Sequence, residues 1–225
     1  MHLTNLSIIG DKYHTDKNCS EYNSHCYTEI YDGYFQKFKN IGRKVKILEI
    51  GVMTGEDLLM INEYFNGECE IYGLDIDLSK VNYKLPNNFH FDQLDATDDE
   101  MMDKWYQNYH KPLFDIIIDD GSHQSYQIIK SLLFLYDKLT HDGIYIIEDL
   151  HATHIFDSHD YLNNSILMYL NFYNNMFDLD LSQLTRSIKS CIIYHNMSSY
   201  NRYRPVIPSN DLLAYSACAI LQFKS

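Results

Sequence analysis

Short apolar runs rich in β-branched residues recur along the chain and are separated by stretches with a different apolar spacing. Each run is bounded by Gly, Asn, Asp or Pro, which is typical of strands buried in a parallel sheet. The first five runs cover residues 45–50, 70–75, 88–94, 114–119 and 143–148. Two later runs, 188–194 and 217–223, are expected to close the sheet.

Between the runs, apolar residues return three or four positions apart, as they do on one face of a helix. The three sets, apolar except for Asn62, are Leu58, Leu59, Ile61, Asn62 and Phe65; Met101, Met102, Trp105 and Tyr109; and Tyr126, Ile129, Leu132, Leu133 and Tyr136. Repeated strand–helix units predict an α/β fold, in which a doubly wound, Rossmann-like parallel sheet carries helices on both faces.

The segments outside this repeat differ in character. Residues 1–42 are rich in Tyr, His and Asp, and we expect them to form helices or a lid over a ligand. After residue 148 a histidine-containing loop leads to a helical stretch over 161–178. Residues 196–210 are polar and tyrosine-rich and read as an insertion loop, a kind of segment that is often functional. We predict one domain over 1–225, with its core over 43–225.

Size and net charge limit the kinds of molecule that the chain is expected to bind. A chain of 225 residues with 45% hydrophobic content suits one globular domain. Lys and Arg total 18 against 31 Asp and Glu, so the formal net charge is −13. Such a surface repels phosphate groups, and we therefore predict neither a nucleic-acid partner nor an anionic membrane surface.

Cysteine usage and the N-terminal residues point to a cytoplasmic protein. The five cysteines form no CxxC pair and are odd in number, so neither a disulfide framework nor a zinc knuckle is expected. Reduced, buried thiols are the simpler interpretation. No basic segment precedes an apolar run at the N-terminus, and no run reaches the roughly 20 apolar residues of a membrane span.

Glycines and a carboxylate follow the first predicted strand. The segment from Glu49 to Gly55 reads E-x-G-x-x-x-G, which differs from the G-x-G-x-x-G of nicotinamide oxidoreductases. Gly51 and Gly55 allow backbone to approach a ligand closely, although ordinary turns use glycine too. Glu49 would repel a diphosphate and attract an ammonium group.

Two more carboxylates stand where the next strands end. Asp75 ends the second strand, twenty positions after Gly55, where it can accept hydrogen bonds from both hydroxyls of a ribose. Asp95 follows the third strand, where it can accept from an adenine amino group. Ligands of open α/β sheets bind beyond the carboxyl ends of the strands, so this placement predicts a nucleoside site.

The fourth and fifth strands each end in an acidic pair. These pairs are Asp119–Asp120 and Glu148–Asp149. Four like charges close together call for a cation, and all-oxygen ligands select Mg²⁺ or Mn²⁺ over zinc. Successive strand residues point to opposite faces, so not all four can be ligands. We choose Asp120, Glu148 and Asp149 as metal ligands and place Asp119 on the cofactor side, where it orients backbone or a neighbouring side chain.

His123 follows Asp120 on the loop that enters the next helix. An imidazole titrates near neutral pH and can take a proton from a metal-bound hydroxyl, which makes His123 the candidate catalytic base. Two alternatives remain open here: His123 caps the helix, and Glu148–Asp149 is a solvated strand end. His151 and His154 read as loop histidines, with His151 close enough to Asp149 to contact a metal ligand.

These motifs resemble a known family. Residues 48–52 (LEIGV), 118–123 (IDDGSH) and 147–151 (IEDLH) are similar to class I S-adenosylmethionine (SAM) dependent O-methyltransferases that modify sugars of macrolide antibiotics, and to the related cephalosporin hydroxylase-like group. The segment 15–17 (TDK), followed by His25 and Tyr27, resembles that family's N-terminal motif. The similarity runs from about residue 10 to residue 155.

The resemblance implies a seven-stranded sheet whose last strand is antiparallel, with SAM and Mg²⁺ as cofactors. It implies that SAM is held by Glu49, Gly51 and Asp75, with Lys17 near its carboxylate. It implies that Mg²⁺ is bound by Asp120, Glu148 and Asp149, with His123 as general base. The family also suggests a homo-oligomer. The glycine turn departs from many relatives at 53–56, and the 196–210 segment has no counterpart.

The expected reaction is methyl transfer from SAM to a hydroxyl of a sugar, glycan or glycosylated small molecule, since Mg²⁺ would lower the pKa of that hydroxyl. One alternative is catechol-type methylation of a phenol. Another is a SAM-fold module that binds without turnover.

Overall fold

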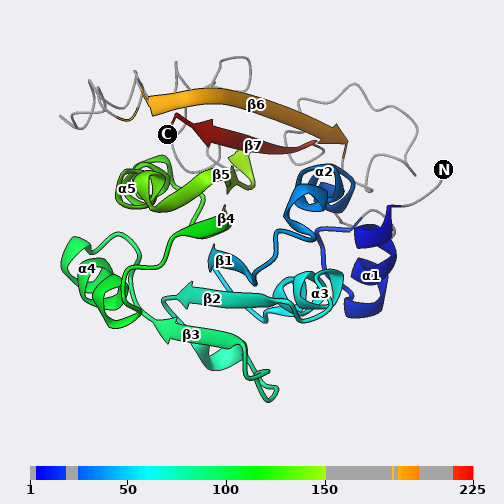
Figure 1. Cartoon of the computed structure of the whole chain (residues 1–225), viewed down its shortest axis with the longest axis horizontal. Helices are drawn as coiled ribbons and strands as arrows, with labels where there is room; N and C mark the ends of the chain where they lie inside the picture. The colour runs from blue at the N-terminus through cyan, green and yellow to red at the C-terminus, as the bar shows by residue number, and fades with distance from the viewer. Residues whose placement is uncertain (1–3, 19–24, 151–183, 185–186, 198–214, 225) are drawn as a thin grey trace.

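Seven strands form one sheet in the computed structural model, which describes residues 4–18, 25–150, 184, 187–197 and 215–224. Their order across the sheet is β3-β2-β1-β4-β5-β7-β6 (Figure 1). The strands are β1 (Val45–Ile50), β2 (Cys69–Asp75), β3 (Phe89–Gln93), β4 (Phe114–Asp119), β5 (Leu139–Ile147), β6 (Ile188–Met197) and β7 (Tyr215–Phe223). Strands β1 to β5 pair in parallel, whereas β7 runs antiparallel to both β5 and β6.

Helices cover both faces of this sheet (Figure 1). The helices are α1 (Asn5–Tyr13), α2 (Tyr27–Phe35), α3 (Glu56–Tyr64), α4 (Asp99–Asn108) and α5 (Ser125–Leu135), with short 3₁₀ turns η1 (Gln36–Phe38), η2 (Leu78–Lys80) and η3 (Tyr136–Lys138). Buried side chains of α1, α2 and α3 form one core cluster with the sheet, and those of α4 and α5 form the other. The sheet is therefore apolar on both faces, which explains its nearly continuous apolar runs.

The predicted fold class is confirmed. All seven predicted runs overlap the observed strands, and the last strand is antiparallel. Strand β5 begins earlier than predicted, because Leu139 pairs with Phe114 at the start of β4. The predicted helix over 161–178 lies outside the described residues, as does all of the 196–210 segment beyond Met197. The single-domain boundaries and the lid role of residues 1–42 stay predictions.

The carboxyl ends of the central strands lie level with one another. Ile50 of β1 is in register with Asp119 of β4, and Asp119 is in register with Ile147 of β5. Backbone hydrogen bonds continue past the strand ends, from Asp120 N to Ile50 O and from Glu148 N to Asp119 O, both at 2.9 Å. The residues that follow the three strands are thereby held at one edge of the sheet.

None of the described helices combines the length and the apolar composition that crossing a membrane requires.

Candidate active site

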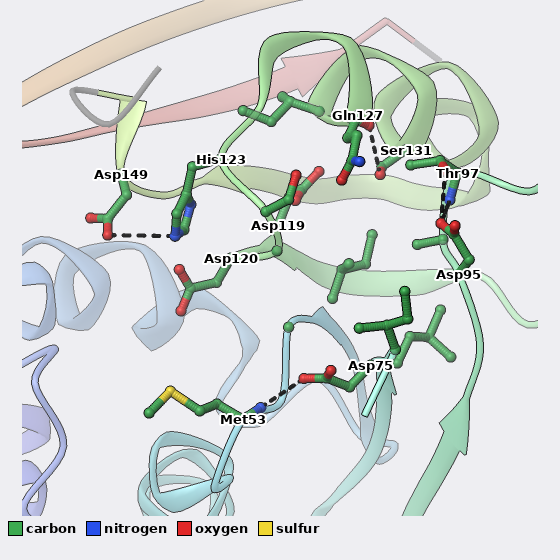
Figure 2. A pocket seen from close by; sticks show the side chains of 18 of the residues that line it. Met53, Asp75, Asp95, Thr97, Asp119, Asp120, His123, Gln127, Ser131 and Asp149 are labelled. Atoms are coloured by element: carbon green, nitrogen blue, oxygen red, sulfur yellow. Dashed lines mark hydrogen bonds and ion pairs between the residues drawn. The ribbon is translucent and has the colours of Figure 1, made fainter. Parts of the chain in front are cut away.

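A cavity of about 500 Å³ opens at the carboxyl edge of the sheet (Figure 2). This volume lies within the range of small-molecule sites. Seven of the predicted site residues line it: Gly51, Asp75, Asp95, Asp119, Asp120, His123 and Asp149. The other four do not line it: Lys17, Glu49, Gly55 and Glu148. The structure therefore brings most of the predicted site together around one cavity and leaves the remainder outside its lining.

Gly51 and Gly55 both have a backbone conformation and close neighbours that a residue with a Cβ could adopt only with strain. Gly51 has a φ of +88°, and a Cβ there would lie 2.1 Å from the backbone oxygen of Asp120. Gly55 has a φ of +76° as the N-cap of α3, and a Cβ there would lie 2.4 Å from Tyr83 Oη. Gly51 thus allows the turn after β1 to pack against the turn after β4, and Gly55 allows α3 to begin.

Asp75 and Asp95 are each fixed by hydrogen bonds at the cavity wall. The two oxygens of Asp75 accept from the backbone N–H groups of Met53 and Asp77, both at 2.9 Å. Asp95 Oδ1 accepts from the backbone N–H of Thr97 at 2.8 Å and from its hydroxyl at 2.7 Å. A carboxylate has about four acceptor positions, so both residues retain lone pairs for a ligand. Figure 2 shows them on the same wall.

Asp119 is buried within this wall. Its Oδ2 accepts a hydrogen bond from the Tyr145 hydroxyl at 3.1 Å. Burial raises the pKa of Asp119 to about 7, against the opposing effect of that hydrogen bond. The position suits the predicted orienting role better than a metal-ligand role, because the side chain is bound to Tyr145 of the neighbouring strand.

Asp120, His123 and Asp149 converge beside the cavity (Figure 2). One ligand atom from each lies within 4.8 Å of the others, and His123 Nε2 is 3.9 Å from Asp149 Oδ2. His123 and Asp149 both have positive φ, at +57° and +49°. Positive φ is costly for residues with a Cβ and is often found at functional sites. Two carboxylates and an imidazole offer a donor set for a divalent cation.

Lys17 contacts this group and forms ion pairs with four carboxylates of the protein. Its Nζ is 2.5 Å from Asp120 Oδ2, 2.8 Å from Glu148 Oε2, 3.3 Å from Asp57 Oδ2 and 3.7 Å from Glu49 Oε1. Burial alone lowers the pKa of Lys17, but the four carboxylates outweigh it and raise that pKa well above its usual value. The expectation was a contact with the carboxylate of SAM; in the structure Lys17 is instead surrounded by acidic side chains.

Glu148 differs from the other predicted metal ligands because protein donors already occupy both of its oxygens. Glu148 is buried and accepts hydrogen bonds on both oxygens, from Lys17 and from the Tyr31 hydroxyl. Burial raises its pKa well above the usual range, with Asp120 adding to the effect. Burial likewise raises the pKa of Asp120, to about 6, while Lys17 opposes the shift. Glu148 would therefore ligate an ion only by exchanging its contact with Lys17.

Sequence reasoning missed Asp57 and Tyr31, and it named Tyr27 only as part of the N-terminal motif, without a role in the site. Asp57, in the first turn of α3, has an oxygen within 4.8 Å of oxygens of Glu49 and Asp120. Tyr27 and Tyr31 lie on α2 and donate hydrogen bonds to Asp149 and Glu148. The signal available for the tyrosines was their spacing of four residues beside the N-terminal family motif, which places both on one helical face.

Two curated O-methyltransferases are similar in sequence to this chain. No family model matches the chain. Mycinamicin VI 2''-O-methyltransferase of Micromonospora griseorubida is 35% identical over 153 residues, which cover 64% of this chain and 36% of the relative. Demethylmacrocin O-methyltransferase of Streptomyces fradiae is 33% identical over 153 residues, with the same coverage of 64% and 36%. The chain resembles the class I SAM-dependent O-methyltransferases.

A solved methyltransferase structure extends this likeness to the fold. The MycE methyltransferase of the mycinamycin biosynthetic pathway, in complex with Mg and SAH, has a TM-score of 0.69 and 25% identity. The match covers 99% of this chain and 55% of that one. This chain therefore spans about half the length of the solved methyltransferase, and the alignments cover about a third of the curated ones. The methyltransferase resemblance inferred from the motifs is confirmed.

Proposed function

We propose that the chain is a SAM- and Mg²⁺-dependent O-methyltransferase that acts on a hydroxyl of a sugar, glycan or glycosylated small molecule. The observation that carries this proposal is the convergence of Asp120, His123 and Asp149 at one end of the cavity that Asp75 and Asp95 also line. Metal-assisted methyl transfer requires a nucleoside-binding wall beside carboxylates that can hold a hard cation and a base that can take the hydroxyl proton. The relatives named as methyltransferases of macrolide sugars support the acceptor class.

The cofactor side of the cavity matches the chemistry of SAM. Asp75 has lone pairs left to accept from the ribose hydroxyls, and Asp95 from the adenine amino group. Ile76, Leu94 and Ala96 add apolar surface to the same wall, where an adenine ring can pack. Gly51 brings backbone to the cavity wall, whereas Glu49 lies outside the lining, with its Oε1 3.7 Å from Lys17 Nζ.

The acidic side of the cavity matches a divalent cation. Asp120 and Asp149 are the carboxylates that would hold the cation, whereas Glu148 forms an ion pair with Lys17. Mg²⁺, when bound, would supply a Lewis acid that lowers the pKa of the acceptor hydroxyl. His123, which is partly exposed to the cavity, would take the hydroxyl proton. The cavity would also contribute to the rate by holding the acceptor hydroxyl in line with the methyl group of the cofactor.

Calorimetric titration with SAM, with and without Mg²⁺ and with NADH as control, tests the cofactor. We expect SAM to bind and NADH not to bind. Incubation with labelled SAM and mycinamicin VI, demethylmacrocin, simple glycosides or a catechol then tests the acceptor. Label transfer to a glycoside supports the proposal, and transfer to the catechol alone would favour the phenol alternative. SAM binding without transfer to any of these would favour a binding module, and absence of SAM binding would refute the proposal.

A further inference from the structure

Helix α2 lies against the acidic pair that follows β5. Tyr27 Oη donates a hydrogen bond to Asp149 Oδ1 at 2.6 Å, and Tyr31 Oη donates one to Glu148 Oε1. The two tyrosines are four residues apart, so they lie one turn apart on the same face of the helix. Two successive turns of α2 thus contact two successive carboxylates of the site.

The rings of these tyrosines are fixed independently of their hydroxyl groups. Tyr27 stacks on His25 at a centroid distance of 5.3 Å and on Tyr31 at 6.0 Å, and Tyr31 stacks on Phe35 at 5.3 Å. Both tyrosines are fully buried. A phenol hydroxyl is protonated at neutral pH, so both tyrosines donate to these carboxylates.

Each carboxylate accepts from a tyrosine on one oxygen and directs its other oxygen to a different group. His25 Nδ1 also lies 3.5 Å from Asp149 Oδ1. Asp149 Oδ1 accepts from Tyr27, while Asp149 Oδ2 faces His123 Nε2 at 3.9 Å. Glu148 Oε1 accepts from Tyr31, while Glu148 Oε2 accepts from Lys17 Nζ at 2.8 Å. A carboxylate turns easily about its terminal bond, so a donor fixed on one oxygen also fixes the direction of the other.

We propose that Tyr27 and Tyr31 are positioning residues for the metal site, so that α2 is a structural part of it. Tyr27 orients Asp149 for cation binding, and Tyr31 orients Glu148, whose other oxygen holds Lys17 beside Asp120. The inference rests on the proposed function, because it requires that the site binds a divalent ion. Hydrogen bonds to ligating carboxylates commonly govern metal affinity, and their loss typically lowers it by about 10- to 100-fold.

Mn²⁺ binding, followed by electron paramagnetic resonance of the full chain at one pH, tests the inference without turnover. The variants are Tyr27→Phe and Tyr31→Phe, which keep the stacked ring and remove only the hydroxyl. We expect Mn²⁺ affinity to fall by about 10- to 100-fold in each variant and the spectrum of the bound ion to change. The matched control is Tyr34→Phe on the same helix, whose hydroxyl instead bonds Tyr194 Oη at 2.7 Å.

The outcomes separate this inference from the proposed function. Weaker Mn²⁺ binding in the two variants, with normal binding in Tyr34→Phe and unchanged thermal unfolding, supports positioning. Mn²⁺ binding equal to that of the wild type in both variants overturns the inference and leaves the proposed function intact. Failure of the wild-type chain to bind Mn²⁺ overturns both. Equal losses in all three variants would show a general effect of α2 and would also overturn the inference.

Discussion

Gly51 and Asp120 are in such close backbone contact that a Cβ at position 51 would lie 2.1 Å from the Asp120 carbonyl oxygen. The two residues follow neighbouring strands, β1 and β4, whose pairing continues through the hydrogen bond from Asp120 N to Ile50 O. The turn proposed to hold the cofactor therefore packs directly on the residue proposed to hold the metal. A change at Gly51 should disturb both sides of the cavity.

Gly51→Ala should destabilise the fold and weaken the binding of both SAM and Mg²⁺. The residue has a φ of +88°, and an added Cβ has no room beside Asp120. Strain and overlap together should lower the free energy of unfolding by about 2–4 kcal/mol, measured by urea denaturation. Gly33→Ala on α2 is the control, because a Cβ there meets nothing within 4 Å. A Gly51→Ala protein as stable as the wild type would contradict the close contact.

Asp75→Asn should reduce SAM affinity by about 10- to 100-fold, as expected for loss of hydrogen bonds to a charged acceptor. An amide has one acceptor oxygen, so it cannot accept from both Met53 N and Asp77 N as the carboxylate does. Calorimetry with SAM measures the effect. Asp77→Asn is the control, since Asp77 is exposed and caps only the η2 turn. Equal affinities in the two variants would show that Asp75 does not contact the cofactor.

His123→Ala should lower kcat by about 10²- to 10⁴-fold, which is the usual contribution of a general base. SAM affinity should be unchanged, because no observed contact links His123 to Asp75 or Asp95. The comparison is His141→Ala, an exposed histidine that contacts Asp142. Retained turnover in His123→Ala would refute its role as base.

Asp115 makes the fold sensitive to acid at a place remote from the cavity. This buried carboxylate accepts from Arg43 Nη1 and Nη2, both at 2.6 Å, from Lys46 N at 3.0 Å and from Thr140 Oγ1 at 2.9 Å. Burial by itself raises the pKa of Asp115, but Arg43 and the other donors outweigh it and leave that pKa below its ordinary value of 3.8.

A carboxyl group with a lowered pKa in the folded state stabilises the fold above pH 3.8, and that stability is lost as the pH falls through the lower folded value. Asp115→Asn should therefore cost about 1.5–3 kcal/mol at pH 7 and progressively less below pH 4. Urea denaturation at several pH values measures the difference. If the difference in unfolding free energy between the wild type and Asp115→Asn stayed constant down to pH 2, the lowered pKa of Asp115 would be contradicted.

The class of fold and the residues at the carboxyl edge of the sheet can be inferred from the amino-acid sequence alone. A strand covered by helices on both faces must be apolar nearly throughout, so runs such as 114–119 are visible without coordinates. Parallel strands place their carboxyl ends at one edge, and the charged residues that follow them therefore had to meet. Asp75, Asp95, Asp120 and Asp149 were predictable on that ground.

The tertiary structure decided which of these residues act together. Tyr27 is 122 positions from Asp149, Tyr31 is 117 from Glu148, and Lys17 is 103 from Asp120. Contacts over such separations leave no periodic signal in the sequence, because they depend on how α2 and the residues before it pack against the sheet. Only that packing assigns Lys17 to the protein's own carboxylates and gives Glu148 two donors, while Asp149 faces His123.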